Sequence, residues 1–177
     1  MLAGLGHRTA GFVSREALEG SERFEAFKRW TGAFGVATEP RWWMAGTGAS
    51  LEAGRAALAG LRSSGTLPTA VVCSHDDTAR SFVDALREQG LRCPEDVSVT
   101  GFEGHPSAGG HASPSLTTVD IHNERQAREA MRLLAKQLSG VKDRPEHVRV
   151  PVSLILRGSV SAPSHGGQTS ELPPGER

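Results

Sequence analysis

Polar side chains that could recognise a small molecule follow several predicted strands of this sequence. They are Ser14 and Arg15, His75 and Asp76, and Glu103, which follows the apolar Phe102. A further stretch that follows a predicted strand is 45–50. Hydroxyl, imidazole and carboxylate groups donate or accept hydrogen bonds, so together they suit a polar ligand. Open parallel sheets bind ligands outside the carboxyl ends of their strands, where these residues are expected to meet. The pattern therefore predicts a binding site at one edge of a sheet.

The elements that must position these residues alternate along the chain. Apolar runs predict strands over 9–13, 41–44, 69–74, 97–101, 116–121 and 148–156. Helical spacing predicts helices over 23–34, 51–62, 77–89 and 123–138, the second of them capped by Ser50. Alternating strands and helices imply right-handed crossovers and an α/β fold with a parallel sheet flanked by helices. Trp30, Trp42 and Trp43 lie within these elements and are expected in the core.

The bulk composition argues against several classes of protein. The 177 residues suit one domain, and 20 basic against 20 acidic residues give a formal net charge of zero. Binding to DNA phosphates usually needs a basic excess, so this chain alone is not expected to bind DNA. No apolar run is long enough to span a membrane and no signal peptide is visible, so we expect a cytoplasmic protein. Cys73 and Cys93 form neither a disulfide framework nor a metal pattern.

Two motifs that could hold a cofactor or a metal are weak. Gly46-Thr47-Gly48 starts like a dinucleotide fingerprint, but Leu51 stands where the third glycine belongs. His105 and His111 lie in one loop without a cysteine or carboxylate pair at ligand spacing. The sequence also lacks the Gly-x-Ser-x-Gly elbow of a hydrolase and a Walker loop. We therefore expect no enzyme activity, no cofactor and no metal, with a nucleotide-binding α/β enzyme as an alternative.

Six short runs follow one another in a characteristic order. They are LGHR at 5–8, RFEAF at 23–27, PTAVVC at 68–73, PEDVSV at 94–99, LTTV at 116–119 and RGS at 157–159. In this order they resemble the effector-binding domain of the LacI/GalR family of bacterial transcription regulators. The runs PEDVSV and LTTV are specific when they occur together at this spacing. The resemblance covers residues 5–159.

The resemblance implies a fold and a function. The expected fold is one lobe, mostly the C-terminal one, of a periplasmic-binding-protein-like (type I) domain over 5–159, with a disordered tail over 160–177. In the family a small effector, often a sugar or a purine, changes how a dimer presents helix-turn-helix headpieces to an operator. These residues would lack the headpiece, and the helix over 123–138 would belong with the first lobe. We expect a homodimer that senses a sugar or nucleoside-like effector, with the sugar-binding component of a transporter as an alternative.

The resemblance also assigns ligand contacts. Arg23 stands at the arginine that reaches the ligand, and Glu103 stands where an aspartate usually accepts hydrogen bonds from effector hydroxyls. His75 replaces the usual asparagine, and its neutral imidazole also donates and accepts. Phe102 would form an apolar floor beside these groups. With Ser14 from the strand-end pattern, the predicted effector-binding residues are therefore Arg23, His75, Glu103, Phe102 and Ser14.

Overall fold

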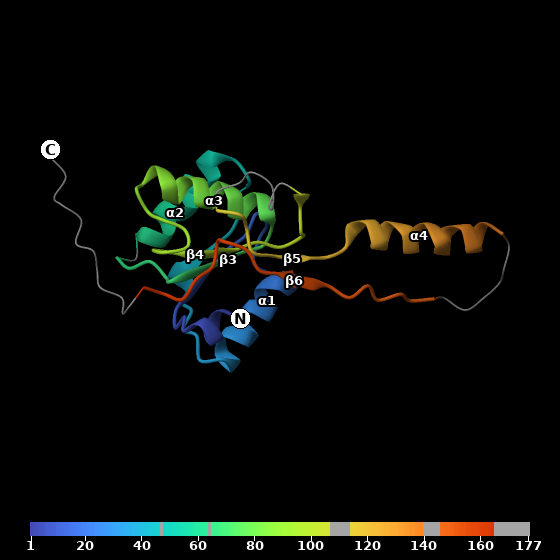
Figure 1. Ribbon diagram of the computed structural model, residues 1–177, viewed down its shortest axis with the longest axis horizontal. Coiled ribbons are helices and arrows are strands. Elements are labelled where there is room, and N and C mark those ends of the chain that lie inside the picture. The colour runs from blue at the N-terminus through green and yellow to red at the C-terminus, as the bar shows by residue number, and fades with distance from the viewer. Residues whose placement is uncertain (47, 64, 107–113, 140–145, 165–177) are drawn as a thin grey trace.

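The computed structural model describes residues 1–46, 48–63, 65–106, 114–139 and 146–164. Its elements alternate as the sequence predicts (Figure 1). In chain order they are η1 (Leu2–Leu5), β1 (Ala10–Val13), α1 (Glu22–Ala33), η2 (Pro40–Trp42), β2 (Trp43–Met44), α2 (Leu51–Arg62), β3 (Ala70–Cys73), α3 (Asp76–Glu88), β4 (Ser98–Thr100), β5 (Thr118–Asp120), α4 (Asn123–Leu138) and β6 (Ser153–Ile155).

Four strands form one parallel sheet in the order β2-β1-β3-β4. In its register Phe12 pairs with Trp43, and Ala70 pairs with both Ala10 and Ser98. Helices α2 and α3 cover one face of the sheet and α1 lies on the other (Figure 1). All pairings in this sheet are parallel, so the strands end at the same edge. The predicted fold class, a parallel sheet flanked by helices, is confirmed.

The core lies on both faces of the sheet. On the α2 and α3 face, Leu61, Phe82 and Leu86 are fully buried against the strands. On the α1 face, Phe24 and Phe27 pack on Phe12 with ring centroids 5.3 and 5.1 Å apart. Burying each large apolar side chain contributes roughly 1.5–3 kcal/mol. These contacts fix the helices on the sheet whose edge carries the predicted site.

Helix boundaries follow their capping residues. The Ser50 hydroxyl accepts a hydrogen bond from the Ala53 N–H at 3.2 Å, so the predicted cap of α2 is confirmed. Ser21 caps α1 in the same way, by accepting from the Phe24 N–H. Such a cap satisfies one of the N–H groups that a helix leaves unbonded at its start. It also sets the position of Arg23 in the first turn of α1.

One helix pair approaches so closely that only glycine fits. A Cβ added at Gly54 of α2 would lie 2.1 Å from the carbonyl oxygen of Ser81 in α3. The two helices therefore pack backbone against backbone at this point. Because α3 begins directly after His75, this contact also holds one side of the candidate site.

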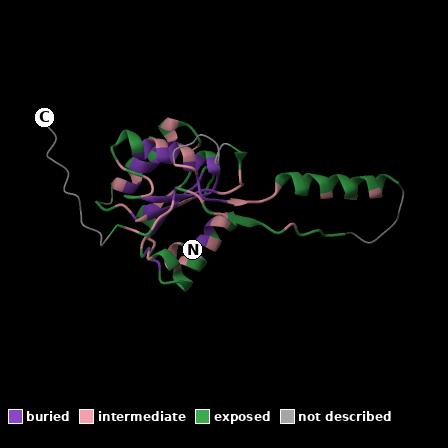
Figure 2. Ribbon diagram, in the orientation of Figure 1, coloured by how far each residue is buried: buried purple, intermediate pink, exposed green. Residues whose placement is uncertain are grey.

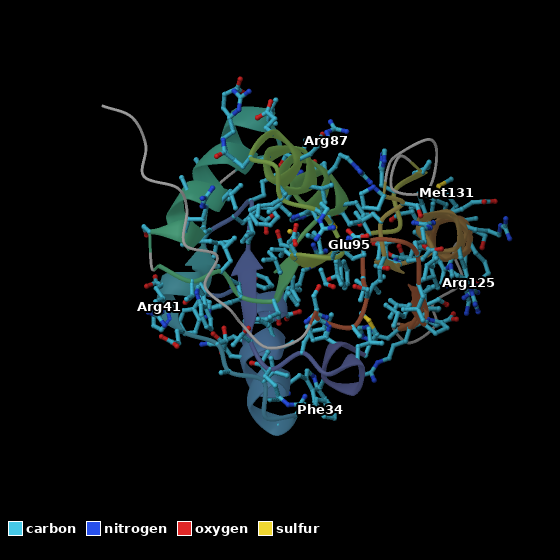
Figure 3. The ribbon with its side chains drawn as sticks, turned by 60° about the vertical axis from the view of Figure 1, so that its left-hand side comes forward. Phe34, Arg41, Arg87, Glu95, Arg125 and Met131 are labelled. Atoms are coloured by element: carbon cyan, nitrogen blue, oxygen red, sulfur yellow. The ribbon has the colours of Figure 1, made fainter. Side chains whose placement is uncertain are left out.

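Two sequence predictions about these elements need correction. Only Trp43 and Met44 of the predicted strand over 41–44 form a strand, because the short helix η2 ends at Trp42. Trp30 is 56% exposed, so it is not a core residue, and Phe34 at the far end of α1 is 64% exposed (Figure 3). Helix α1 buries only Phe24 and Phe27, and its later turns lie beyond that contact with the sheet.

Strands β5 and β6 form a separate antiparallel pair that carries α4 away from the sheet (Figure 1). The predicted strand over 148–156 is shorter, because only Ser153–Ile155 is paired. Helix α4 begins and ends at the predicted residues, yet none of its residues is buried (Figure 2). Met131 and Leu138 are 64% and 79% exposed, and Figure 3 shows Met131 on α4, away from the sheet. Among the residues that the structure describes, none covers the apolar stripe of α4.

The end of the described chain is held on the fold. The Ser161 N–H donates to the Ser98 hydroxyl at 3.2 Å, and His7 Nε2 lies 2.9 Å from the Ser161 carbonyl oxygen. Residues 160–164 are therefore part of the folded unit, and the prediction of a disordered tail is wrong for them. The rest of that predicted tail, 165–177, lies outside the described residues.

Among the described residues, no helix is both long and apolar enough to cross a membrane.

Candidate functional site

Three strand ends meet at one edge of the sheet. Ser14 follows β1, Ser74 and His75 follow β3, and Glu103 lies just past β4. The Ser74 N–H donates to the carbonyl oxygen of Val13 at 2.9 Å, which ties the first two ends together. The Ser74 hydroxyl in turn accepts from the Arg15 N–H at 3.2 Å. The expectation that these residues gather at one edge is confirmed, whereas a ligand contact by any of them stays a prediction.

Arg23 joins helix α1 to this edge. Its Nη1 donates to the carbonyl oxygen of Ser74, and its guanidinium carbon lies 4.2 Å from the centroid of the Phe102 ring. A guanidinium over an aromatic ring gains roughly 0.5–2 kcal/mol, and the contact also fixes the plane of both groups. Arg23 and Phe102 therefore form one rigid wall, built from α1 and the loop after β4.

His75 lies at the centre of the polar groups and is 4% exposed. Its Nδ1 is 2.7 Å from the Ser74 hydroxyl. That hydroxyl also accepts from the Arg15 N–H, so Ser74 holds both the loop after β1 and the imidazole ring. Nε2 faces two carboxylates, with Glu16 Oε1 at 3.5 Å and Glu103 Oε1 at 3.6 Å. An imidazole thus sits between two carboxylates at the sheet edge.

Glu16 is the site residue that the sequence prediction missed. The predicted candidates after β1 stopped at Ser14 and Arg15, although the loop continues outward. Arg15 turns aside to form an ion pair with Asp77 at 2.9 Å, and Glu16 faces His75 instead. Extending the strand-end rule by two residues would have included Glu16, but nothing in the sequence gives the direction of the loop.

Glu103 has an uncommon backbone conformation. Its φ is 113°, in the left-handed half of the map where glycine is favoured, and Gly104 follows at φ 70°. The Glu103 N–H donates to the Val119 carbonyl oxygen at 2.9 Å, which holds the residue in place. Residues kept in such conformations cost roughly 1–3 kcal/mol and cluster at binding sites. The conformation places the Glu103 carboxylate beside His75.

Asp76 fastens the loops beneath the site. This carboxylate is 2% exposed, accepts from the Thr118 hydroxyl, and accepts from the His105 N–H at 2.7 Å. A Cβ on Gly101 would lie 2.1 Å from Asp76 Oδ1, so the strand end passes directly over the carboxylate. Asp76 therefore ties the start of α3 to the loop that carries Phe102 and Glu103.

Ser14 lies below the surface of the site. It is fully buried, and its hydroxyl accepts from the Glu16 N–H at 3.1 Å. Its own N–H donates to the Met44 carbonyl oxygen at 2.8 Å. In this structure Ser14 shapes the loop that presents Glu16, and its direct contact with a ligand stays a prediction.

Two hollows border the site. A groove of about 610 Å³ runs along α1 and is lined by Arg23, Phe102, Trp30 and Phe34, but not by His75 or Glu103. A hollow of about 620 Å³ lies beside Gly104 and the first turns of α4. The predicted residues thus divide into an apolar wall and a polar cluster, which meet where Arg23 bonds to Ser74. The second hollow adjoins the polar cluster because Gly104 follows Glu103.

The described residues contain no group of three His, Cys, Asp or Glu side chains that could hold a metal ion. His111, one of the two loop histidines considered for zinc, lies outside the described residues, as does Thr47 of the glycine turn. Burial raises the pKa of both thiols, that of Cys93 to about 12 and that of Cys73 further. Neither cysteine is a thiolate nucleophile near neutral pH.

The fold and the strand-end site define one lobe of an α/β protein of the periplasmic-binding type. A family of periplasmic binding protein-like domains matches residues 1–160. The chain belongs to this family, and its structural neighbours are sensor domains of LacI-type regulators. It is similar to the HTH-type transcriptional repressor PurR of Pasteurella multocida (strain Pm70), with 30% identity over 160 residues. The match covers 89% of this chain and 47% of the relative.

Two solved structures show the same lobe. A sugar-binding LacI-family regulator from Escherichia coli, complexed with phosphate, has a TM-score of 0.78 and 28% identity, and covers 92% of this chain and 58% of that one. A LacI-family regulator from Lactobacillus casei with bound sucrose has a TM-score of 0.75 and 25% identity, over 89% and 58% of the two chains. This chain spans about half the length of the curated relative.

Proposed function

We propose that this chain is the effector-sensing part of a LacI-type transcriptional repressor. A small molecule, a sugar or a nucleoside-like compound, would bind at the strand ends and change how the whole protein holds its operator. Family membership and the similarity to a repressor support this assignment over a transporter component or a nucleotide-binding enzyme. A related regulator holds sucrose, which supports a sugar as one ligand class.

One observation carries the proposal. Arg23, His75 and Glu103 come from α1, the loop after β3 and the loop after β4, yet they converge at the single edge where parallel sheets bind ligands. Phe102 beneath Arg23 adds an apolar surface on which a sugar or base could lie. A few convergent polar groups beside an apolar surface are typical of small-molecule sites.

The remaining parts of the proposal concern partners. Operator binding would depend on a helix-turn-helix headpiece, because this stretch has no net charge. The exposed stripe of Met131, Leu134 and Leu138 on α4 supports self-association into a homodimer. We infer a cytoplasmic regulator without a catalytic cofactor. Light scattering tests the dimer. A mobility-shift assay tests the need for a headpiece, and we expect this chain alone to show no sequence-specific DNA binding.

The ligand site is tested by an NMR titration of the chain with neutral sugars and nucleosides. We expect saturable amide shifts at Arg23, His75 and Glu103. Half of a cleft buries less of its ligand than a closed one, so affinity should be millimolar at best, about 4 kcal/mol. Glu103→Ala should weaken binding. Glu95→Ala is the matched control, because Glu95 lies before β4, at the opposite end of that strand.

Two results would contradict the proposal. One is saturable binding that maps away from the strand ends. The other is binding that survives the double substitution of Arg23 and Glu103 by alanine. Either would show that these residues do not form the effector site.

A further inference from the structure

Two carboxylates place negative charge at the strand ends. Two carboxylates, Glu16 and Glu103, face the same imidazole nitrogen, and their side chains are 62% and 30% exposed. Within the described ranges, no hydrogen bond to another side chain satisfies either carboxylate. Nε2 of His75 lies 3.5 and 3.6 Å away, beyond the 2.7–3.2 Å of a normal hydrogen bond. The carboxylates thus keep most of their capacity to accept.

The nearby cations are engaged elsewhere. Arg15 is paired with Asp77, and Arg23 bonds to the Ser74 carbonyl oxygen and lies over the Phe102 ring. Neither guanidinium forms an ion pair with Glu16 or Glu103 among the residues that the structure describes. Two carboxylates therefore face a single imidazole, which can carry at most one positive charge. The mouth of the site is therefore negatively charged.

The buried imidazole brings the two carboxylates to one place at the strand ends. The side chain of His75 is 5% exposed, and its Nε2 lies within 3.6 Å of one oxygen from each carboxylate. A donor placed there would meet one oxygen from Glu16 and one from Glu103. Phe102, the residue before Glu103, lies under the Arg23 guanidinium and lines the groove along α1.

We propose that the site selects a polyhydroxy ligand that carries a protonated amino group, and rejects anionic ligands such as sugar phosphates. This rests on the proposed function, because it names the ligand class of the same site. An ammonium group offers three donors and a full positive charge to the two carboxylates. A phosphate in that position would lie against two carboxylates, and like charges in contact oppose binding.

Three matched probes test the proposal: glucosamine, glucose and glucose 6-phosphate, each titrated into the full chain by NMR. We expect glucosamine to bind at least about tenfold more tightly than glucose, and glucose 6-phosphate to bind least. The shifts should centre on Glu16, His75 and Glu103. Because both carboxylates are partly exposed, high salt should weaken glucosamine binding and leave glucose binding nearly unchanged.

Charge-removing variants supply the control. Glu16→Gln and Glu103→Gln should each reduce the preference for glucosamine, while Glu95→Gln should keep it. Glu16→Gln is exposed and leaves the core intact, so a folding defect does not confuse its result. Equal binding of glucose and glucosamine at the strand ends would overturn the ammonium preference and leave the proposed function standing. Failure of all three probes, of other neutral sugars and of nucleosides to bind would overturn both.

Discussion

Replacing Gly54 by alanine tests the packing that holds α3, and with it the start of the site. The added Cβ would lie 2.1 Å from the Ser81 carbonyl oxygen and 2.5 Å from the Ser81 carbonyl carbon. Both atoms belong to the backbone of α3, so they cannot rotate away as a flexible side chain would. The helices must separate by about an ångström, which loosens the apolar layer between them.

Two opposing terms set the size of the effect. Overpacking of this kind costs roughly 1–3 kcal/mol, while alanine in a helix gains about 0.5–1 kcal/mol over glycine. The difference leaves Gly54→Ala with a free energy of unfolding lower by up to about 2.5 kcal/mol. Gly32→Ala in α1 is the matched control, because a Cβ there meets nothing within 4 Å. The control should gain up to ~1 kcal/mol.

Urea unfolding followed by circular dichroism measures both variants. The midpoints should move in opposite directions with unchanged slopes, because the surface exposed on unfolding stays the same. In a thermal scan each kcal/mol corresponds to ~2–4 °C for a chain of this size. If Gly54→Ala were as stable as Gly32→Ala, α2 and α3 would not meet at this residue, and the position of α3 would be wrong.

Three further predictions concern buried and strained groups. Burial lowers the pKa of His7 below its usual 6.5, against the opposing bond to the Ser161 carbonyl. The unfolded chain therefore binds a proton that the fold resists, so stability should fall as pH drops below about 6.5, and His7→Gln should flatten that dependence in urea titrations. At Glu103, with φ 113°, the glycine variant should be more stable than the alanine variant by at least ~1 kcal/mol in thermal unfolding. Equal stability of the two variants would remove the argument for strain. Asp76→Asn should cost about 1–3 kcal/mol in urea unfolding, because it weakens the acceptor for Thr118 and His105; an unchanged midpoint would contradict the fastening role of Asp76.

The sequence predicted the helices best where local signals were strong. Ser50 supplies a cap that acts within three residues, and α4 has a regular apolar spacing, so both boundaries agree with the structure. The convergence of His75 and Glu103 also followed from local patterns, because parallel strands must end at one edge. These features depend on short-range chemistry and on the handedness of the crossovers.

Features set by long-range contacts escaped prediction. Trp30 has the same helical spacing as Phe24 and Phe27, but whether a helix turn meets the sheet depends on where the sheet ends. Glu16 lies in a loop whose path is set by the bond from its N–H to Ser14 and by the pairing of Arg15 with Asp77. No periodicity in the sequence encodes such a path.

The site and the exposed helix are physically connected. The Glu103 N–H donates to the Val119 carbonyl oxygen, and Glu103 forms a bridge with Asp120 at the end of β5. His122 follows, bonded through its N–H to Asp120 Oδ1 at 2.7 Å, and α4 begins at the next residue. A displacement of Glu103 by a ligand must therefore be absorbed in β5 or passed to α4. Since β5 is only three residues long and α4 has no buried residue, moving α4 would break little apolar packing among the described residues.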